Sequence, residues 1–198
     1  MTTILINPDS LQAIALAASK EQSRYYLNGV NVELYKDGSY GLIATDGHRL
    51  HTLQTKANEA LDSSYILSND DIKKAVSLAK MARKEIGRGL QQLINIQIDA
   101  AFNIKIVCAG KEFGAFTATP VDGTFPDWRR VIPSSTEGGS PVMAFDADYM
   151  ADFGEACRLL NGTKTSCIEM TSTGKNNPMI IKVAGCPDFL GVLMPMRF

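Results

Sequence analysis

The stretch YILSNDDIKKAVSLAKMARKE, residues 65–85, joins a short apolar run to a helical pattern and sets the fold expected for the whole chain. Tyr65 to Leu67 predict a short strand, and Ser68 is a good N-cap for a helix that runs to about Glu85. Apolar residues at helical spacing form one stripe of this helix, while lysines gather on a different face. The segment therefore predicts an amphipathic helix with a basic outer side.

Three runs with strand character follow this helix. LINIQIDA at 93–100 and NIKIVCAG at 103–110 alternate apolar and polar residues with a period of two, and FGAFTATPV at 113–121 is a third run. One strand, one helix and three strands thus make a unit that is complete by about residue 121.

The same order precedes this unit in the chain. SLQAIALAASK at 10–20 is spaced as an amphipathic helix, which we expect from about residue 9 to 20. The segments 26–35 and 41–53 read as strands, and the Asp-Gly pair within 36–39 is a hairpin signal between them. The first unit is therefore expected to span about residues 1–62 and the second about 63–122.

A third copy of the order follows a segment rich in Pro, Gly and Ser at 122–141, which predicts a linker. Residues 143–145 predict a strand, Asp146 an N-cap, and Gly162 the stop of a helix that ends near Leu160, with three strands after it. Three similar units indicate an α+β repeat fold, in which each helix packs on a small antiparallel sheet.

Composition limits the function. With 198 residues, 45% of them hydrophobic, the chain can bury a substantial core. Twenty basic and twenty-one acidic residues give a net charge of -1, so any positive surface must be local, and residues 73–88 are the clear concentration. The four cysteines show no CxxC spacing, which favours reduced thiols and no metal site. No signal or membrane segment is seen, and a cytoplasmic location without membrane contact is expected.

Four strings carry a family resemblance: RYYLNGV at 24–30, ATDGHRL at 44–50, GTFPDWRRVIP at 123–133 and VLMPMRF at 192–198. In this order they resemble the bacterial replicative sliding clamp, the DNA polymerase III β subunit. The resemblance implies a DNA-clamp fold in shortened form: a complete middle domain at 1–133 with a linker over 123–140, and half of a third domain at 141–198.

In this family, domains form a ring with antiparallel sheets outside and helices lining a hole for duplex DNA. The resemblance implies sequence-independent contact with DNA phosphates by the basic helix, and the DNA-facing candidates are Lys73, Lys74, Lys80, Arg83 and Lys84. Without the resemblance, such a lysine face is more often just a solvated surface. The helix near 146–160 is acidic, which argues against a uniformly basic hole.

The four strings also match the family's pocket for short peptide motifs on DNA polymerase and other clamp-binding proteins. By position, the resemblance assigns pocket-lining roles to Leu27, Thr45, Gly47, His48, Arg49, Leu50, Pro126, Arg130, Val131, Val192, Leu193, Met194, Pro195, Met196 and Arg197. Leu, Val and Met would supply an adaptable apolar floor, and the arginines could hold carbonyls or a carboxylate. Trp128 is at least as readily an anchor for the linker as a partner contact.

Three functions remain to be weighed. A sliding clamp would need an oligomer, and since a family ring contains twelve units and this chain supplies three, four copies would match that number. The alternative is a decoy or regulator that binds clamp-binding motifs without encircling DNA. An enzyme is the weakest reading, because His48 and Asp46 are accompanied by no nucleophile motif or phosphate loop, and no cofactor is implied.

Overall fold

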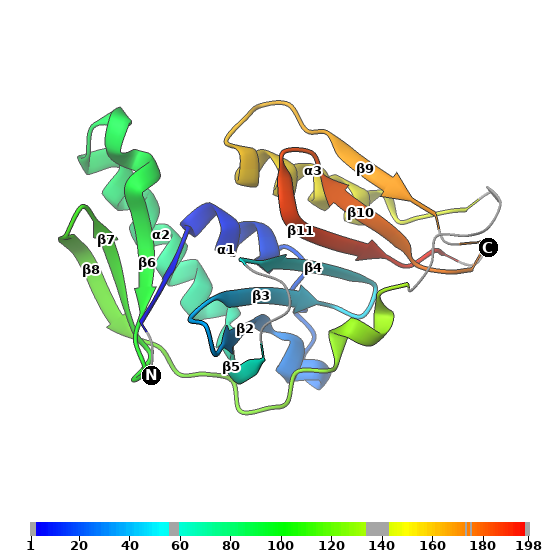
Figure 1. The fold of residues 1–198 in the computed structure, drawn as a ribbon, viewed down its shortest axis with the longest axis horizontal. Coiled ribbons are helices and arrows are strands. Elements are labelled where there is room, and N and C mark those ends of the chain that lie inside the picture. Colours follow the sequence, from blue (N-terminus) through cyan, green and yellow to red (C-terminus); the bar gives the residue numbers. More distant parts are fainter. Residues whose placement is uncertain (1–2, 56–59, 134–142, 173, 175, 197–198) are drawn as a thin grey trace.

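The computed structural model describes residues 3–55, 60–133, 143–172, 174 and 176–196 (Figure 1). The α-helices of these residues are α1 (Pro8–Ala15), α2 (Asn69–Glu85) and α3 (Ala147–Asn161). Short 3-10 helices lie at Gln22–Leu27 (η1), Arg88–Leu93 (η2) and Trp128–Val131 (η3). The strands are β1 (Ile4–Ile6), β2 (Gly29–Tyr35), β3 (Tyr40–Thr45), β4 (Arg49–Gln54), β5 (Leu61–Ser68), β6 (Ile94–Ile98), β7 (Asn103–Cys108), β8 (Lys111–Thr117), β9 (Ile168–Thr171), β10 (Met179–Val183) and β11 (Cys186–Leu193).

The first two units exchange their opening strands. One sheet has the order β1-β6-β7-β8, so the strand that opens the first unit lies beside β6 of the second. In return, β5 opens the second unit but pairs with β2 of the first. The two units therefore hold each other through backbone hydrogen bonds as well as through their helices.

The third unit extends the other sheet. Its last strand, β11, runs antiparallel to β4 from Phe189 opposite Leu53 to Leu193 opposite Arg49, which gives the order β5-β2-β3-β4-β11-β10-β9 (Figure 1). We call this β4–β11 pairing the seam. It joins segments far apart in the sequence into one seven-stranded sheet.

A polar residue begins each α-helix. Asn7, Ser68 and Asp146 accept hydrogen bonds from backbone N–H groups of the first turn, and Ser68 also donates to Asp71, whose N–H it caps. α1 packs against both α2 and α3, and one continuous apolar core fills the space between the helices and the two sheets. The caps and helix ends expected at Ser68, Asp146 and Gly162 are confirmed.

Two expected elements are shorter in the structure. The first helix ends at Ala15 instead of near residue 20, because the N–H groups of Ala17 and Ala18 turn to carbonyls three residues back and Ser19 N–H donates to the carbonyl of Leu27. The strand expected at 143–145 is reduced to one bridge between Ala144 and Met196, since no second strand lies beside it among the described residues.

Candidate functional site

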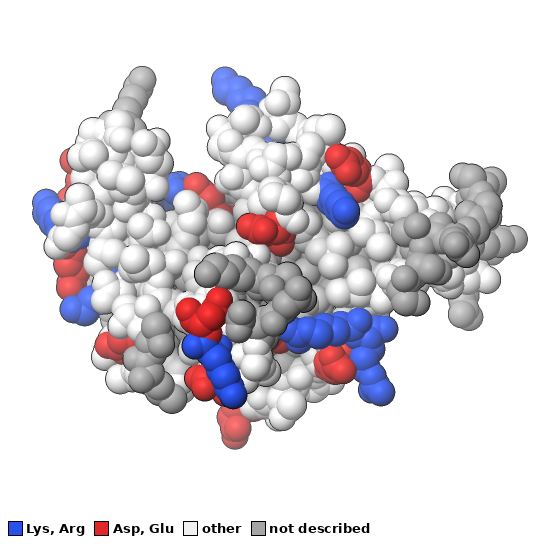
Figure 2. Space-filling view, viewed as in Figure 1, with Lys and Arg blue, Asp and Glu red and all other residues white. Residues whose placement is uncertain are grey.

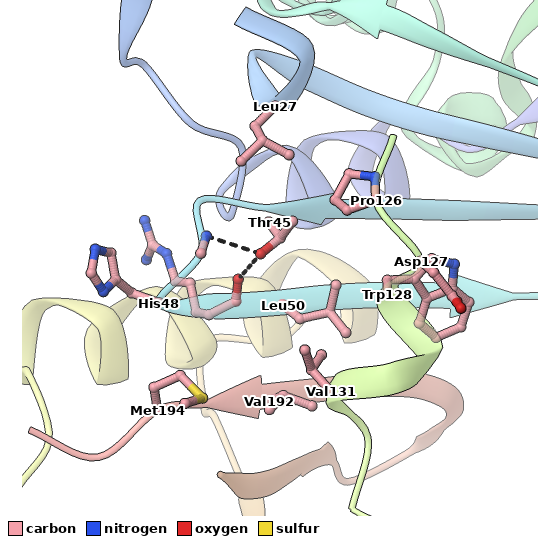
Figure 3. Close-up of a pocket in the computed structure, with 12 residues that line it drawn as sticks. Leu27, Thr45, His48, Leu50, Pro126, Asp127, Trp128, Val131, Val192 and Met194 are labelled. Carbon is pink, nitrogen blue, oxygen red and sulfur yellow. Dashed lines mark hydrogen bonds between the residues drawn. The ribbon is translucent and has the colours of Figure 1, made fainter. Parts of the chain in front are cut away.

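A hollow of about 160 Å³ lies over the seam on the face of the large sheet opposite the helices (Figure 3). The turn before β4, the end of β11 and the segment around η3 form its walls. Its lining residues are Leu27, Thr45, Gly47, His48, Arg49, Leu50, Pro126, Asp127, Trp128, Val131, Val192 and Met194. Figure 3 shows Leu27, Pro126, Leu50, Val131 and Val192 converging on its centre. The surface is mostly apolar, with polar groups at one end, as is usual for ligand pockets.

Hydrogen bonds fix the turn at 45–49. The Thr45 hydroxyl accepts from the Gly47 N–H at 3.1 Å and donates to the carbonyl of Arg49 at 2.7 Å. The Asp46 carboxylate accepts from the N–H groups of His48 and Arg49. Gly47 has φ +91°, and a Cβ there would lie 2.6 Å from a guanidinium nitrogen of Arg24, so the position favours glycine. This wall of the hollow is preformed.

Arg49 ties this turn to the third unit. Its guanidinium pairs with Asp46 at 3.1 Å, pairs with Asp152 of α3 and lies 4.5 Å from the ring centre of Tyr149. The side chain of Arg49 is only 10% exposed, so these contacts hold it in place. The His48 ring stacks on the same tyrosine with centroids 5.9 Å apart. The docking of α3 on the first unit thus adds contacts that hold one end of the hollow.

A buried polar network holds the opposite wall. Trp128 donates its indole N–H to Glu33 at 2.9 Å, and Arg129 donates to both oxygens of that carboxylate. Tyr35 also donates to Glu33. Burial acts to raise the pKa of Glu33, but the hydrogen bonds from Arg129, Tyr35 and Trp128 outweigh it and hold the pKa below its usual value. The network fastens η3 to β2, and Trp128 is an anchor that also lines the hollow.

Aromatic side chains support the seam from the helix side. His51 on β4 is fully buried between Phe153 and Phe189, with ring centroids 4.6 and 5.4 Å away. Its Nδ1 lies 2.9 Å from the carbonyl oxygen of Ala13. Gly191, opposite His51, leaves room for Phe153, since a Cβ on Gly191 would be 2.4 Å from that ring. The docking of the third unit therefore rests on close packing around an uncharged histidine.

The structure brings together most of the residues assigned to the pocket, and places others elsewhere. Leu193 is fully buried in the core on the helix side of the sheet. Arg130 is exposed and lies 3.9 Å from Asp127, while Pro195 and Met196 follow the hollow along the chain without lining it. Arg197 lies outside the described residues. Asp127 and Trp128 were not assigned to the lining, although both stand inside the GTFPDWRRVIP string.

The basic candidates of α2 divide into two groups. Lys73 and Lys80 lie with Lys20 along a groove of about 400 Å³ between α1 and α2, and Lys84 is exposed on the same face of the helix. Arg83 instead forms a two-point ion pair with Asp9 at 2.7 Å. Lys74 lies 3.5 Å from Asp71, and its ammonium is 5.8 Å from the ring centre of Phe116. Lys20 is the basic residue of this groove that the sequence pattern did not single out.

Most acidic residues of α3 have local roles. Asp146 caps the helix, Asp152 pairs with Arg49, and Glu155 pairs with Arg158 at 2.8 Å. On the face shown in Figure 2, basic and acidic side chains are interspersed and form no single block of charge. The helix therefore leaves less negative charge unpaired than the α3 sequence suggests, because capping and ion pairs engage most of its carboxylates.

Two features are absent from the described part of the chain. None of its helices is long and apolar enough to cross a membrane. Within the same residues, no cluster of three His, Cys, Asp or Glu side chains suits a metal ion.

Comparison with known proteins gives one family. The family model described as DNA polymerase III beta subunit, central domain, matches residues 8–127. The beta sliding clamp of Caulobacter vibrioides is 27% identical over 160 residues, which cover 78% of this chain and 39% of that protein. That of Rickettsia bellii is 25% identical over 169 residues, covering 83% and 41%. The chain thus spans about two fifths of the length of these relatives.

Solved structures share the fold. The DNA polymerase III subunit beta of Pseudomonas aeruginosa superposes with a TM-score of 0.71 at 19% identity, over 100% of this chain and 66% of that one. The beta subunit from Thermotoga maritima gives 0.67 at 18% identity, with the same two coverages. The expected DNA-clamp fold is confirmed by these superpositions.

Proposed function

We propose, from the premise that this chain belongs to the DNA polymerase III beta subunit family, that it is a DNA sliding clamp that tethers replication proteins to duplex DNA through the hollow at the seam. The hollow is the observation that carries the proposal. It is mostly apolar, and its walls are held by the turn at 45–49 and by the Glu33 network. Preformed walls lower the entropic cost of binding.

Met194 offers the sharpest test of the hollow. Its side chain is 40% exposed and lines the hollow, so Met194→Ala removes contact area for a ligand without opening a core cavity. We expect the Kd for a labelled clamp-binding-motif peptide to rise about tenfold, equivalent to about 1.4 kcal/mol. The matched control is Met81→Ala, on an equally flexible side chain that is 56% exposed on α2. Fluorescence anisotropy that gives the same Kd for both variants and the parent chain would remove the pocket assignment.

Contact with DNA is the second part of the proposal. The groove between α1 and α2 carries Lys20, Lys73 and Lys80 above an apolar floor, on the side of the helices away from the sheets. Ammonium groups in such a row would attract a phosphate backbone without reading base sequence. Arg83 contributes less in this view, because Asp9 already engages it in a two-point ion pair. Lys73 and Lys74 each lie near one acidic side chain a turn away, Asp70 at 3.4 Å and Asp71 at 3.5 Å.

The assembly follows from the domain division. We propose that residues 1–133 are a complete clamp domain and residues 141–198 half of one, so that the protein acts as a non-catalytic, cytoplasmic subunit in a closed ring of several copies. Four copies would supply twelve units. A decoy that binds motif peptides would keep the hollow and need neither ring nor DNA. Retention on circular but not linearised DNA separates the two functions.

A further inference from the structure

Within the residues that the structure describes, the sheet of the third unit lacks a strand that both other units have. β2 is flanked by β5, and β6 is flanked by β1, in each case an opening strand from the other unit. β9 occupies the corresponding place in the third unit, yet no strand pairs with its outer edge among the described residues. β2 is almost wholly buried, whereas three of the four residues of β9 are exposed.

In the described part of the chain, the opening segment of the third unit likewise has a neighbour on one side only. Ala144 lies two residues before the cap of α3 and bridges Met196, just as Ile66 lies two residues before the cap of α2 and bridges Val121. The segment around Ile66 also pairs with β2 on its other side. Residues 143–145 have no such second partner in the described part of the chain.

An apolar side chain marks the uncovered edge. A two-residue turn joins β7 to β8 with Cys108 opposite Ile94, and a similar turn joins β10 to β11 with Val183 opposite Ile168. Ile168 of β9 therefore corresponds to Ile94 of β6. Two residues further along these strands, Met170 corresponds to Ile96. Ile96 is fully buried beside the opening strand β1, whereas Met170 is 54% exposed.

We infer that a second copy of this chain completes the third unit, with residues 143–145 of each copy pairing antiparallel with β9 of the other. Among the described residues, each copy presents an opening segment that is paired on one side only and a strand edge without a neighbour, so two copies satisfy each other about a two-fold axis. By the register of Ile6 opposite Ile96, Phe145 of one copy lies opposite Met170 of the other. The second copy also supplies the unit that the half-domain lacks. That unit has the same order, an opening segment followed by a capped helix. The inference rests on the repeated units alone and stands whether or not the chain binds DNA or peptides.

Light scattering over a concentration series tests the interface. We expect the parent chain to have a mass that is an even multiple of 21.5 kDa, and Met170→Lys to halve it, because a charge on the core-facing side of an edge strand opposes pairing. Met170→Leu and Leu5→Lys, the latter on a 51% exposed apolar residue of β1, should keep the parent mass. A monomeric parent chain, or a Met170→Lys variant with parent mass and parent circular dichroism, would overturn the inference. Motif-peptide affinity unchanged in Met170→Lys shows that the variant is folded and that the hollow does not depend on this interface.

Discussion

Acidification should weaken the seam through His51. This side chain is fully buried between Phe153 and Phe189, and burial lowers its pKa from 6.5 to about 4, against a smaller opposing effect of the hydrogen bond to the carbonyl of Ala13. The folded protein thus keeps the ring neutral in a pH range where an unfolded chain takes up a proton. Proton binding therefore stabilises the unfolded state relative to the folded state as the pH falls through this range.

The size of the effect follows from proton linkage. Stability from this site is complete above pH 6.5 and is lost as the pH falls from 6.5 to about 4. At about 1.4 kcal/mol for each pH unit, the free energy of unfolding should fall by about 3 kcal/mol over this range. Such a loss is a large fraction of the stability of an ordinary domain.

Urea unfolding of the parent chain and of His51→Gln across this pH range isolates the contribution. Glutamine cannot titrate but can donate to the carbonyl of Ala13. The carboxylates contribute the same pH dependence to both proteins, so the difference between the proteins reports on His51. We expect the unfolding free energy of the parent chain minus that of His51→Gln to fall by about 3 kcal/mol as the pH falls from 6.5 to about 4. Parallel curves for the two proteins would refute the reasoning, since they would show that His51 takes up no extra proton on unfolding.

Two further variants, a double substitution in the groove and a single one at the seam, extend these tests. Lys73→Glu combined with Lys80→Glu should lower retention on circular DNA and reduce the slope of log affinity against log salt by about 2, because each lost phosphate contact removes about 0.9. The control Lys182→Glu, on an exposed residue of β10, should change neither quantity. Equal losses in the double variant and the control would contradict the groove assignment. Gly191→Ala should destabilise the fold by about 1–3 kcal/mol, because the added methyl would meet the buried Phe153 ring. An unchanged melting temperature would show that this ring can move.

Local sequence signals predicted the elements of the fold well. The cap at Ser68, the stop at Gly162 and the alternation of β6 and β7 act within a few residues, so the sequence pattern alone reveals them. The exchange of β1 and β5 between units could not be read in this way. Tertiary packing decides which strands far apart in the chain pair with each other. The alternation of apolar and polar residues in each strand is the same for either partner.

The candidate site was predicted in outline only. The turn at 45–49 and Met194 lie in strings that resemble the family, and the structure brings them together. The engagement of Arg49 by Asp152 was not predicted, because it crosses a hundred residues of chain. Leu193 was misplaced for a simpler reason: it alternates with Val192 across the sheet, so only one of the two can face the hollow.

The position of the hollow over the seam has a mechanical consequence. Its lining comes from β4 on one side and β11 on the other, and η3 lies across both. A ligand seated there bridges the two halves of the seven-stranded sheet, and its binding free energy opposes their separation by RT ln(1 + [L]/Kd). A ligand in the hollow would therefore hold the two halves of the sheet together, so that the chain would resist separation along the seam most strongly while the hollow is occupied.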